Sequence, residues 1–322
     1  MKNLNIGILL LTFNSEKYIL NCLNSVKNIA SQIVIVDSGS VDNTINICKK
    51  FPVEIYFKKF NNDFSEQRNF ALSHLRTDWV LMIDSDEELT FFDINEIKKI
   101  STNPQLGGIN FIIKNFLNNS TELTTHRYTR LFRNNKLFKF RYKIHEQIRE
   151  SIEENGYEII NTDFEITHYG YNTIDNDKLQ RNIKLLESEI SDNDDDFMKY
   201  HLANTLFAKK EYSIADKIYR EIIYKDQLEN SQLENAKIRV AQILFSESKY
   251  DEAYNFLNFQ SDNENIEGFR LFMLGSIFIY RQEYHKAYEI LNNDIIKLSN
   301  MVNKELLKNA IDLLNKLLSG QL

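Results

Sequence analysis

The chain has 322 residues, 43% of them hydrophobic, which is enough to bury a sizeable core and predicts two domains. Its 39 basic and 46 acidic residues give a net charge of −7 at pH 7. This charge argues against broad binding to nucleic acid or to anionic membranes, since both require excess Lys and Arg. With only Cys22 and Cys48, and with no run long enough for a signal peptide or a membrane span, we expect a reduced, cytoplasmic protein.

Up to about Leu106, short apolar runs alternate with amphipathic segments. Strands are expected at 6–11, 33–36, 54–57 and 80–83, with helices from about residue 16, at 43–50 and after Asp63. Asp63 is expected to cap its helix, with Glu66 at the matching position of a capping box. Because the strands are apolar throughout and separated by helices, they predict a parallel sheet covered on both faces.

Polar clusters follow three of these strands: Thr12-Phe13-Asn14, Asp37-Ser38-Gly39-Ser40 and Asp84-Ser85-Asp86. Ligands of such sheets bind beyond the carboxyl ends of the strands, so the clusters are expected to converge on one edge. The last cluster runs on into Glu87 and Glu88, and four neighbouring carboxylates indicate a cation. Mg²⁺ or Mn²⁺ commonly bridges one or two carboxylates to phosphates, which predicts a metal carrying a diphosphate. Alternatively, Glu87 and Glu88 begin the next helix.

Three further strand-like runs lie at 109–116, 126–133 and 138–145, and we expect them to be antiparallel and to cover or flank this edge. Arg130 and Arg133 are three positions apart, so on a strand they would point to opposite faces. We expect Arg130 to face the site and Arg133 to be a solvated charge. His145 and Glu146 would end the third strand.

From about Asp177 onward the chain is almost free of Gly and lacks Pro, and it predicts an all-helical region. The segments 200–219, 238–257 and 272–291 share a small residue followed twelve positions later by alanine. The small residues are Ala203, Ala241 and Gly275, and the alanines are Ala215, Ala253 and Ala287. The separation between equivalent alanines of successive repeats is close to the tetratricopeptide period of about 34 residues. We expect domains at 1–176 and 177–322, the second a short solenoid or, alternatively, an irregular helical bundle.

Four runs occur in order along the chain: TFNSEKYILNCLNSV, IVIVDSGSVDNT, NNDFSEQRNFAL and WVLMIDSDEEL. They resemble the GT-A catalytic domain of family-2 glycosyltransferases, and the resemblance continues through RLFR, IHEQI and THYGY into the helical tail. The whole chain is similar to bacterial glycosyltransferases with helical-repeat tails, including peptide S-glycosyltransferases that modify cysteine in bacteriocin precursors. The resemblance implies an α/β, Rossmann-like GT-A domain followed by an all-α tetratricopeptide-like domain.

The resemblance also implies roles for single residues. Asp37 would accept the imide N–H of uracil, Arg68 would donate to a uracil carbonyl, and Asp86 would bind the metal as part of a DXD motif. Nucleotide-sugar contacts are further implied for Thr12, Asn14, Asp84 and Ser85, with Arg130 chosen for the diphosphate. Asn14 departs from the family, many members of which have an acidic residue there.

Simpler roles compete with some of these assignments. Turn chemistry is the alternative for Asp37 and Asp42, and a surface salt bridge with Glu66 or Asp63 is the alternative for Arg68. Glu146 is our choice for the catalytic base, with His145 as a structural or phosphate-side partner. His168 is kept as a possible metal or diphosphate ligand.

These residues predict a metal-dependent, inverting transfer of a hexose from a UDP-sugar, with Mn²⁺ or Mg²⁺ as cofactor and a polypeptide as the first-choice acceptor. The alternatives are a cell-surface glycan or lipid-linked acceptor, a nucleotidyltransferase, and a non-catalytic adaptor whose repeats are the functional part. The helical tail could hold the acceptor, hold a partner protein or form a homodimer. No nucleic acid and no stable membrane insertion are expected.

Overall fold

A computed structural model describes residues 4–116, 123–169 and 176–319. Gly170 and Tyr171 of the THYGY motif lie outside these ranges. The chain divides into two compact units, Met1–Asp175 and Asn176–Leu322. Within the described ranges, no helix combines the length and the apolar character that crossing a membrane requires.

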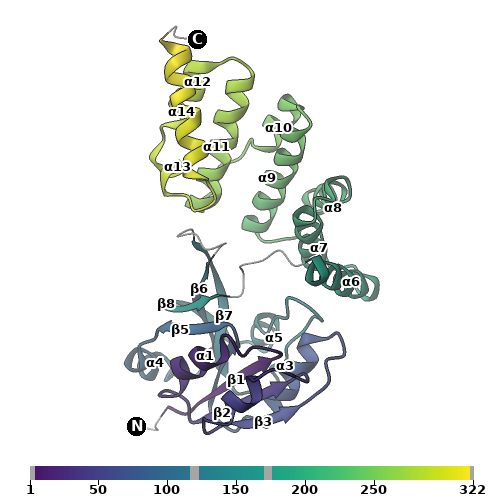
Figure 1. The fold of residues 1–322 in the computed structure, drawn as a ribbon, viewed down its shortest axis with the longest axis vertical. Coiled ribbons are helices and arrows are strands. Elements are labelled where there is room, and N and C mark those ends of the chain that lie inside the picture. The colour runs from purple at the N-terminus through teal and green to yellow at the C-terminus, as the bar shows by residue number, and fades with distance from the viewer. Residues whose placement is uncertain (1–3, 117–122, 170–175, 320–322) are drawn as a thin grey trace. The chain divides into compact units, whose positions relative to one another are not determined.

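The first unit begins with four parallel strands: β1 (Ile6–Thr12), β2 (Gln32–Asp37), β3 (Glu54–Phe57) and β4 (Trp79–Asp84). The helices α1 (Ile19–Val26), α2 (Thr44–Cys48) and α3 (Phe64–His74) connect them (Figure 1). The predicted parallel sheet is confirmed in these strands. All four strands run in the same direction, so their carboxyl ends lie along one edge.

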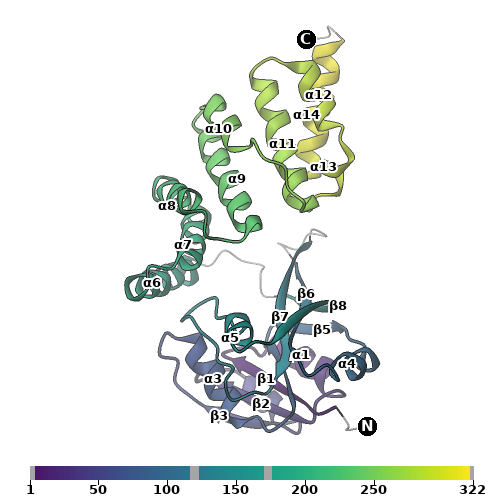
Figure 2. The same cartoon turned by 180° about the vertical axis from the view of Figure 1, so that it is seen from behind.

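Four more strands complete the sheet: β5 (Glu87–Phe91), β6 (Leu106–Phe116), β7 (Leu123–Arg133) and β8 (Glu158–His168). The strand order is β3-β2-β1-β4-β7-β6-β8-β5. β7 runs antiparallel to both β4 and β6, as expected for the runs 109–116 and 126–133. Two helices, α4 (Ile94–Ile100) and α5 (Arg149–Glu154), complete this unit (Figure 2). The whole sheet is therefore mixed, because the later strands join its parallel half directly.

The run 138–145 does not form the expected third strand. Its ladder pairing is limited to an isolated bridge between Arg141 and Gln147, and Tyr142 and His145 have positive φ angles of +70° and +55°. Two left-handed residues within four positions turn the chain back on itself. Glu146 therefore follows a loop and does not end a strand.

Backbone groups of Phe140 and Lys143 in this loop bond to residues of α3 and not to a neighbouring strand. The side-chain amide of Asn69 accepts from Phe140 N–H and donates to Phe140 C=O, both at 2.9 Å. The N–H of Phe64 donates to Lys143 C=O at 2.8 Å. Because buried backbone groups must be paired somewhere, these contacts replace the strand that the alternating sequence predicted.

Two apolar layers cover the parallel strands. Side chains alternate along β1, so Ile8 and Leu10 face α1, while Leu9 faces the layer formed with α3. Asp63 caps α3, its Oδ1 accepting Glu66 N–H at 2.8 Å, as the sequence predicts. The helices thus anchor the strands from both faces and leave the carboxyl edge to the loops.

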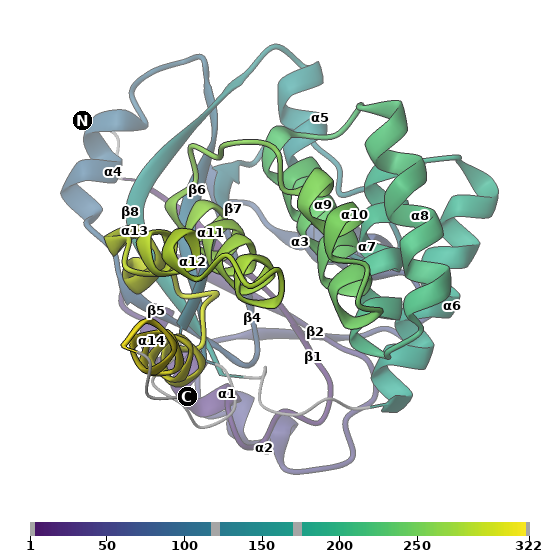
Figure 3. The same ribbon diagram turned by 90° about the horizontal axis from the view of Figure 1, so that it is seen from above.

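The second unit consists of nine described helices: α6 (Asn176–Asp192), α7 (Asp196–Ala208), α8 (Tyr212–Lys225), α9 (Asn230–Ser246), α10 (Tyr250–Phe256), α11 (Glu264–Tyr280), α12 (Tyr284–Leu291), α13 (Asp294–Leu298) and α14 (Lys304–Leu318). The pairs α7–α8, α9–α10 and α11–α12 pack as hairpins and carry the three predicted repeats (Figures 1 and 3). A Cβ on Gly275 would lie 2.5 Å from the Leu291 side chain, so only glycine fits there without a shift of Leu291.

The turns of the three hairpins share a geometry that the sequence analysis missed. Lys210, Ser248 and Gln282 occupy equivalent positions and all have a left-handed backbone, with φ between +61° and +66°. In each turn the following N–H donates back to the preceding helix, the pattern of a Schellman cap. The repeat therefore extends to backbone conformation even where no glycine marks the turn.

Candidate active site

Hydrogen bonds that involve side chains join the loops after β1 and β2 at the carboxyl edge of the sheet. Asn14 N–H donates to Ser40 Oγ, and Val41 N–H donates to Asn14 Oδ1, both at 2.9 Å. Asn14 adopts φ +47°, a conformation that Asn tolerates better than most residues. Ser15 Oγ lies 2.7 Å from Ser85 Oγ in the turn after β4. The three polar clusters predicted from the sequence therefore lie side by side.

Asp37 is fully buried and closes its own turn. Its Oδ1 accepts the N–H groups of Gly39 and Ser40 at 2.9 Å, and its Oδ2 accepts the Ser40 hydroxyl at 2.5 Å. Asp42 also accepts a backbone N–H, from Thr44 at 3.0 Å. Turn chemistry is thus present at both residues, and any contact of Asp37 with uracil remains a prediction.

Asp84 is paired with two buried arginines. Arg68 Nη2 donates to Asp84 Oδ1, and Arg130 Nη1 lies 3.7 Å from Asp84 Oδ2. Burial alone would raise the pKa of Asp84, but the two guanidinium groups hold that pKa well below its ordinary value. Arg68 is only 3% exposed, so the alternative of a surface salt bridge with Glu66 or Asp63 is wrong.

Glu87 closes the turn that carries Asp86. It is 2% exposed; its Oε1 accepts from Arg130 Nη2 at 2.6 Å and its Oε2 accepts the Asp84 N–H at 2.8 Å. The expectation that Glu87 and Glu88 begin a helix is wrong, because both lie on β5 and Glu87 satisfies a buried charge. Within this turn the Asp86 side chain pairs with His168, whereas Asp84 pairs with the two arginines.

Arg130 and Arg133 lie on opposite faces of β7, as expected. Arg133 donates to the carbonyls of Leu106 and Asn103 at 2.5 and 2.7 Å, and its guanidinium lies 4.8 Å from the centre of the Trp79 ring. The expectation that Arg133 is a solvated charge is wrong, because it ties backbone carbonyls to the sheet. The contact of Arg130 with a diphosphate remains a prediction.

Glu146 reaches the same charged network through Arg68. Arg68 Nε donates to Glu146 Oε1 at 3.0 Å, and the Glu146 side chain is 14% exposed. Burial raises the pKa of Glu146, and this effect exceeds the opposing effect of Arg68. The Tyr128 hydroxyl donates to the backbone carbonyl of Glu146 and positions the loop. A carboxylate with a raised pKa at the rim of the site suits a general base.

His145 lies next to this base and is half-buried. Burial lowers the pKa of His145 to about 4, so the imidazole is neutral at pH 7. Its φ of +55° turns the chain between Lys143 and Glu146. The geometry therefore fits the structural role expected for His145 better than a charge contact with phosphate.

Asp86 and His168 form a pair in a part of the site that solvent reaches, as it also reaches the Asp84 side chain, which is 37% exposed. Their side chains are 31% and 21% exposed, and Oδ2 of Asp86 lies 3.2 Å from Nε2 of His168. The other ring nitrogen of His168, Nδ1, lies 2.9 Å from Oδ1 of Asn115. Burial lowers the pKa of His168, but the hydrogen bond and negative charge of Asp86 outweigh it, so the net shift is upward. These two residues come from β8 and the turn after β4, 82 positions apart.

Asp86 and His168 fit two ligand positions of one divalent cation. Ligand atoms at right angles and about 2.1 Å from an ion lie about 3 Å apart, close to the separation of Oδ2 and Nε2. A carboxylate oxygen suits Mg²⁺ or Mn²⁺, and an imidazole nitrogen suits transition-metal ions. Nowhere in the described ranges are three or more His, Cys, Asp or Glu side chains grouped to hold an ion alone. The other positions would therefore be filled by water or phosphate oxygens.

Three buried polar atoms at this edge lack a hydrogen-bond partner among the described residues: Thr12 Oγ1, Arg68 Nη1 and Arg130 Nε. Thr12 and Arg68 are each 3% exposed. A buried donor left unpaired costs about 1–3 kcal/mol, so such atoms indicate a missing partner. Thr12 and Arg68 were predicted to contact the nucleotide, and Arg130 its diphosphate.

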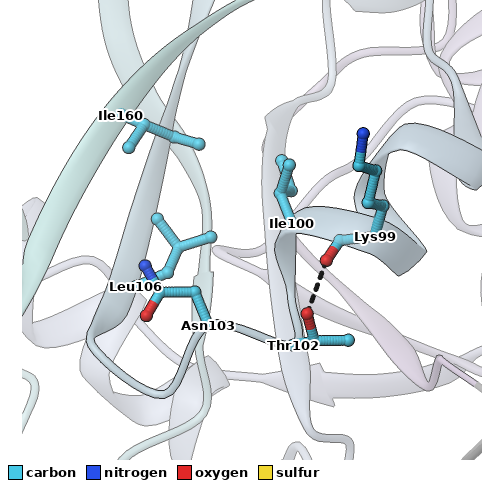
Figure 4. A pocket seen from close by; sticks show the side chains of 6 residues that line it. All are labelled: Lys99, Ile100, Thr102, Asn103, Leu106 and Ile160. Atoms are coloured by element: carbon cyan, nitrogen blue, oxygen red, sulfur yellow. Dashed lines mark hydrogen bonds between the residues drawn. The ribbon is translucent and has the colours of Figure 1, made fainter.

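A separate hollow of about 330 Å³ lies between α4 and the edges of β6 and β8 (Figure 4). Its lining includes Ile100, Leu106 and Ile160, and Thr102 Oγ1 donates to the Lys99 carbonyl at 2.7 Å across its rim. None of the predicted site residues lines it. The hollow is therefore distinct from the carboxyl edge.

The sequence analysis missed three residues that shape this edge: Glu87 as a buried anchor, Ser15 as a link between loops, and Asn115 beside His168. Only Asn115 carried a local signal. It is the polar member of the alternating row that includes Ile109, Phe111 and Ile113. The other two depend on contacts with distant segments.

Residues 8–163 match the family model described as glycosyl transferase family 2. A relative named "SPbeta prophage-derived glycosyltransferase SunS", from Bacillus subtilis, is 33% identical over 55% of this chain and 43% of its own length. A TPR repeat-containing protein from Synechococcus elongatus is 26% identical over 55% of this chain and 44% of its own. The matched stretch thus spans less than half of either relative.

Among solved structures, S. aureus TarS aligns with a TM-score of 0.42 at 16% identity, covering 78% of this chain and 54% of TarS. Glucosyl-3-phosphoglycerate synthase from Mycobacterium tuberculosis, in complex with Mn²⁺, UDP and phosphoglyceric acid, aligns with a TM-score of 0.40 at 14% identity, covering 59% and 78%. The family assignment rests on the sequence match and not on these alignments. The first unit of this chain is a glycosyltransferase domain of family 2.

Proposed function

We propose that the chain is a metal-dependent, inverting glycosyltransferase that transfers a hexose from a UDP-sugar to a polypeptide. One observation carries the metal and the donor: of the carboxylates in the turn after β4, Asp84 and Glu87 are paired with arginines, while Asp86 is paired with His168. Asp84 is paired with two buried arginines, whereas Asp86 has no arginine partner among the described residues. Asp86 is therefore the carboxylate suited to bind an added cation.

Asp86 and His168 would hold the ion, and Thr12 and Arg68 offer unpaired buried atoms to the nucleotide. When bound, the ion offsets the negative charge that develops on the leaving diphosphate. Glu146 takes the acceptor proton during a single in-line displacement, which inverts the anomeric carbon. Arg68 orients Glu146 through its Nε–H.

The acceptor is proposed from the second unit. Stacked helical hairpins form extended surfaces suited to a peptide, and the three hairpins share one packing and turn geometry. A cysteine thiol is the proposed acceptor atom, following the resemblance to peptide S-glycosyltransferases. A glycan or lipid-linked acceptor is the competing proposal within the enzyme class.

The test is calorimetric titration of UDP with and without Mn²⁺, together with a panel of UDP-sugars scored for hydrolysis. The change Asp86→Asn should abolish the Mn²⁺-dependent gain in UDP affinity and lower donor turnover by about a hundredfold or more, since a metal supplies several kcal/mol. UDP binding in EDTA should be unchanged.

A matched control is Asp163→Asn, since the Asp163 side chain is 89% exposed on β8. It should behave as the wild type. If UDP binds equally well with and without Mn²⁺ and no UDP-sugar is hydrolysed, the metal-dependent transferase is excluded and the adaptor hypothesis gains. Wild-type turnover in Asp86→Asn would remove Asp86 from the metal site.

A further inference from the structure

A row of polar side chains crosses four strands next to Asp86. Glu87 on β5 is paired in register with His168 on β8, and His168 with Asn115 on β6. Residues paired in register point to the same face of a sheet. His126 on β7 lies diagonally across from Asn115, with its Nδ1 3.3 Å from Asn115 Nδ2. The row runs from the DXD turn to the far side of β6.

Asn115 occupies a position where an apolar residue would be expected. Ile109, Phe111 and Ile113 precede it on the same face of β6, and all three are buried in the core. Asn115 is itself only 5% exposed. A buried amide is unfavourable unless it is hydrogen-bonded, so its placement requires specific partners.

Those partners determine how the amide is oriented. The amide Nδ2–H donates to a ring nitrogen of His126, which directs Oδ1 toward His168 at 2.9 Å. A carbonyl oxygen only accepts hydrogen bonds, so the hydrogen in this contact belongs to His168 Nδ1. In the neutral ring that leaves the lone pair on Nε2, the atom that faces Asp86 Oδ2 at 3.2 Å.

A lone pair and a carboxylate oxygen at this distance share a cation: a proton on Nε2 in the hydrogen bond described above, or a divalent ion that takes its place. We propose that Asn115 is a positioning residue, which holds His168 so that Nε2 presents its lone pair to a divalent cation shared with Asp86. This inference rests on the proposed metal site. Partners of this kind orient metal-bound histidines, and their loss typically lowers metal affinity by about 10–100-fold.

The experiment measures Mn²⁺ binding to the full chain in the presence of saturating UDP, from the electron paramagnetic resonance signal of free Mn²⁺. Asn115→Leu removes the acceptor at similar size and should weaken Mn²⁺ binding by about 10–100-fold. Asn115→Asp retains an acceptor oxygen and should bind Mn²⁺ within a few-fold of the wild type. Pulsed resonance should detect ¹⁴N coupling from imidazole in the wild type and Asn115→Asp, and a diminished coupling in Asn115→Leu.

Asn161→Leu is the matched control, because Asn161 is an exposed amide on β8 that bonds to Asn110 and not to His168. It should leave Mn²⁺ affinity unchanged. UDP affinity in EDTA reports whether each variant keeps a folded donor site. If Asn115→Leu does not fold, Asn115→Ser, which is too short to reach Nδ1, provides the same test.

The outcomes separate this inference from the proposed function. A wild type that binds no Mn²⁺ with UDP would overturn the metal site and the inference together. If His168→Ala weakens Mn²⁺ binding and removes the ¹⁴N coupling while Asn115→Leu matches the wild type, the metal site stands and the role of Asn115 is refuted.

Discussion

The turns after β2 and β4 solve the same electrostatic problem in different ways. Each places an aspartate at the carboxyl end of a buried parallel strand. Asp37 is neutralised within three residues, by the N–H groups and hydroxyl of its own turn. Asp84 is neutralised from a distance, by Arg68 on α3 and Arg130 on β7. The charge of Asp37 is stabilised by groups of its own turn. The charge of Asp84, by contrast, connects β4 with α3 and β7 in one network.

This difference makes the turn after β4 the more informative one for function. Because Asp84 and Glu87 hold their arginines, Asp86 is left to meet a ligand. The comparison predicts that changes in the long-range network affect catalysis and stability strongly. Changes in the local turn should have small effects on stability.

The largest effect is expected at Glu146. Glu146→Gln removes the proposed base and should lower transfer by about 10²–10⁴-fold, with UDP affinity nearly unchanged. Partial recovery at high pH would indicate a thiol acceptor, because a thiol with a pKa of about 8.5 ionises without help. Glu150→Gln, in the first turn of α5 with a side chain that is 40% exposed, is the control and should transfer normally. Unaffected transfer in Glu146→Gln would assign the base to another group.

Arg68→Met should be the most destabilising change in the network. It leaves the carboxylates of Asp84 and Glu146 without their shared partner, and breaking a buried pair costs about 3–5 kcal/mol. Trp79 is the sole tryptophan and is buried in the first unit, so its fluorescence during urea unfolding reports that unit alone.

The control for this change is Arg149→Met, which breaks an exposed pair with Glu153 on α5. Pairs of that kind contribute about 0.3–0.5 kcal/mol. Equal, small losses in Arg68→Met and Arg149→Met would show that the long-range network does not stabilise the unit, and the contrast between the two turns would fail.

A pH effect is expected from His145. Its folded pKa, lowered to about 4 by burial, lies below the unfolded value. The unfolded chain therefore binds the proton more readily, so stability is present above about pH 6.5 and is lost as pH falls toward 4. Between pH 7.5 and 5 the loss should be about 1–2 kcal/mol.

His145→Asn keeps a residue that tolerates the left-handed backbone but cannot take up the proton. The variant should lose less stability than the wild type over the same pH range, measured by Trp79 fluorescence in urea at each pH. An identical pH dependence in both proteins would contradict a buried, neutral imidazole.

The smallest effect is expected at Asp37, where the comparison is most direct. Asp37→Asn keeps one oxygen for the N–H groups of Gly39 and Ser40, and Asn caps N–H groups about as well as Asp, so the loss should be below about 1 kcal/mol. Asp84→Asn should cost more, because it removes a charge shared by two arginines. A larger loss at Asp37 than at Asp84 would reverse the comparison.

The parallel half of the sheet could be predicted from sequence because its signals are local. Apolar runs mark β1 to β4, and the Asp63 cap marks the start of α3. The run 138–145 misled for the same reason: its alternation resembles a strand, but the amide of Asn69 takes both hydrogen bonds of Phe140. A side chain 71 positions away cannot be identified from a local pattern.

The features of the candidate site likewise divide into those that local sequence predicts and those that depend on distant contacts. The convergence of three polar clusters followed from the direction of the strands, and it is confirmed. The burial of Glu87 could not be predicted, because its partner Arg130 lies 43 positions away on a strand of unknown register. Placing Asn115 beside His168 likewise requires the pairing of β6 with β8, which no short motif encodes.

The two cysteines have a consequence for an enzyme proposed to modify thiols. Cys22 and Cys48 are both fully buried, and the Cys22 thiol donates to the Asp84 carbonyl at 3.3 Å, directly beneath the DXD turn. Burial raises the pKa of both thiols, that of Cys48 to about 11. Neither presents a thiolate to an activated sugar, so the folded enzyme offers no internal nucleophile that competes with its substrate and is protected against labelling itself.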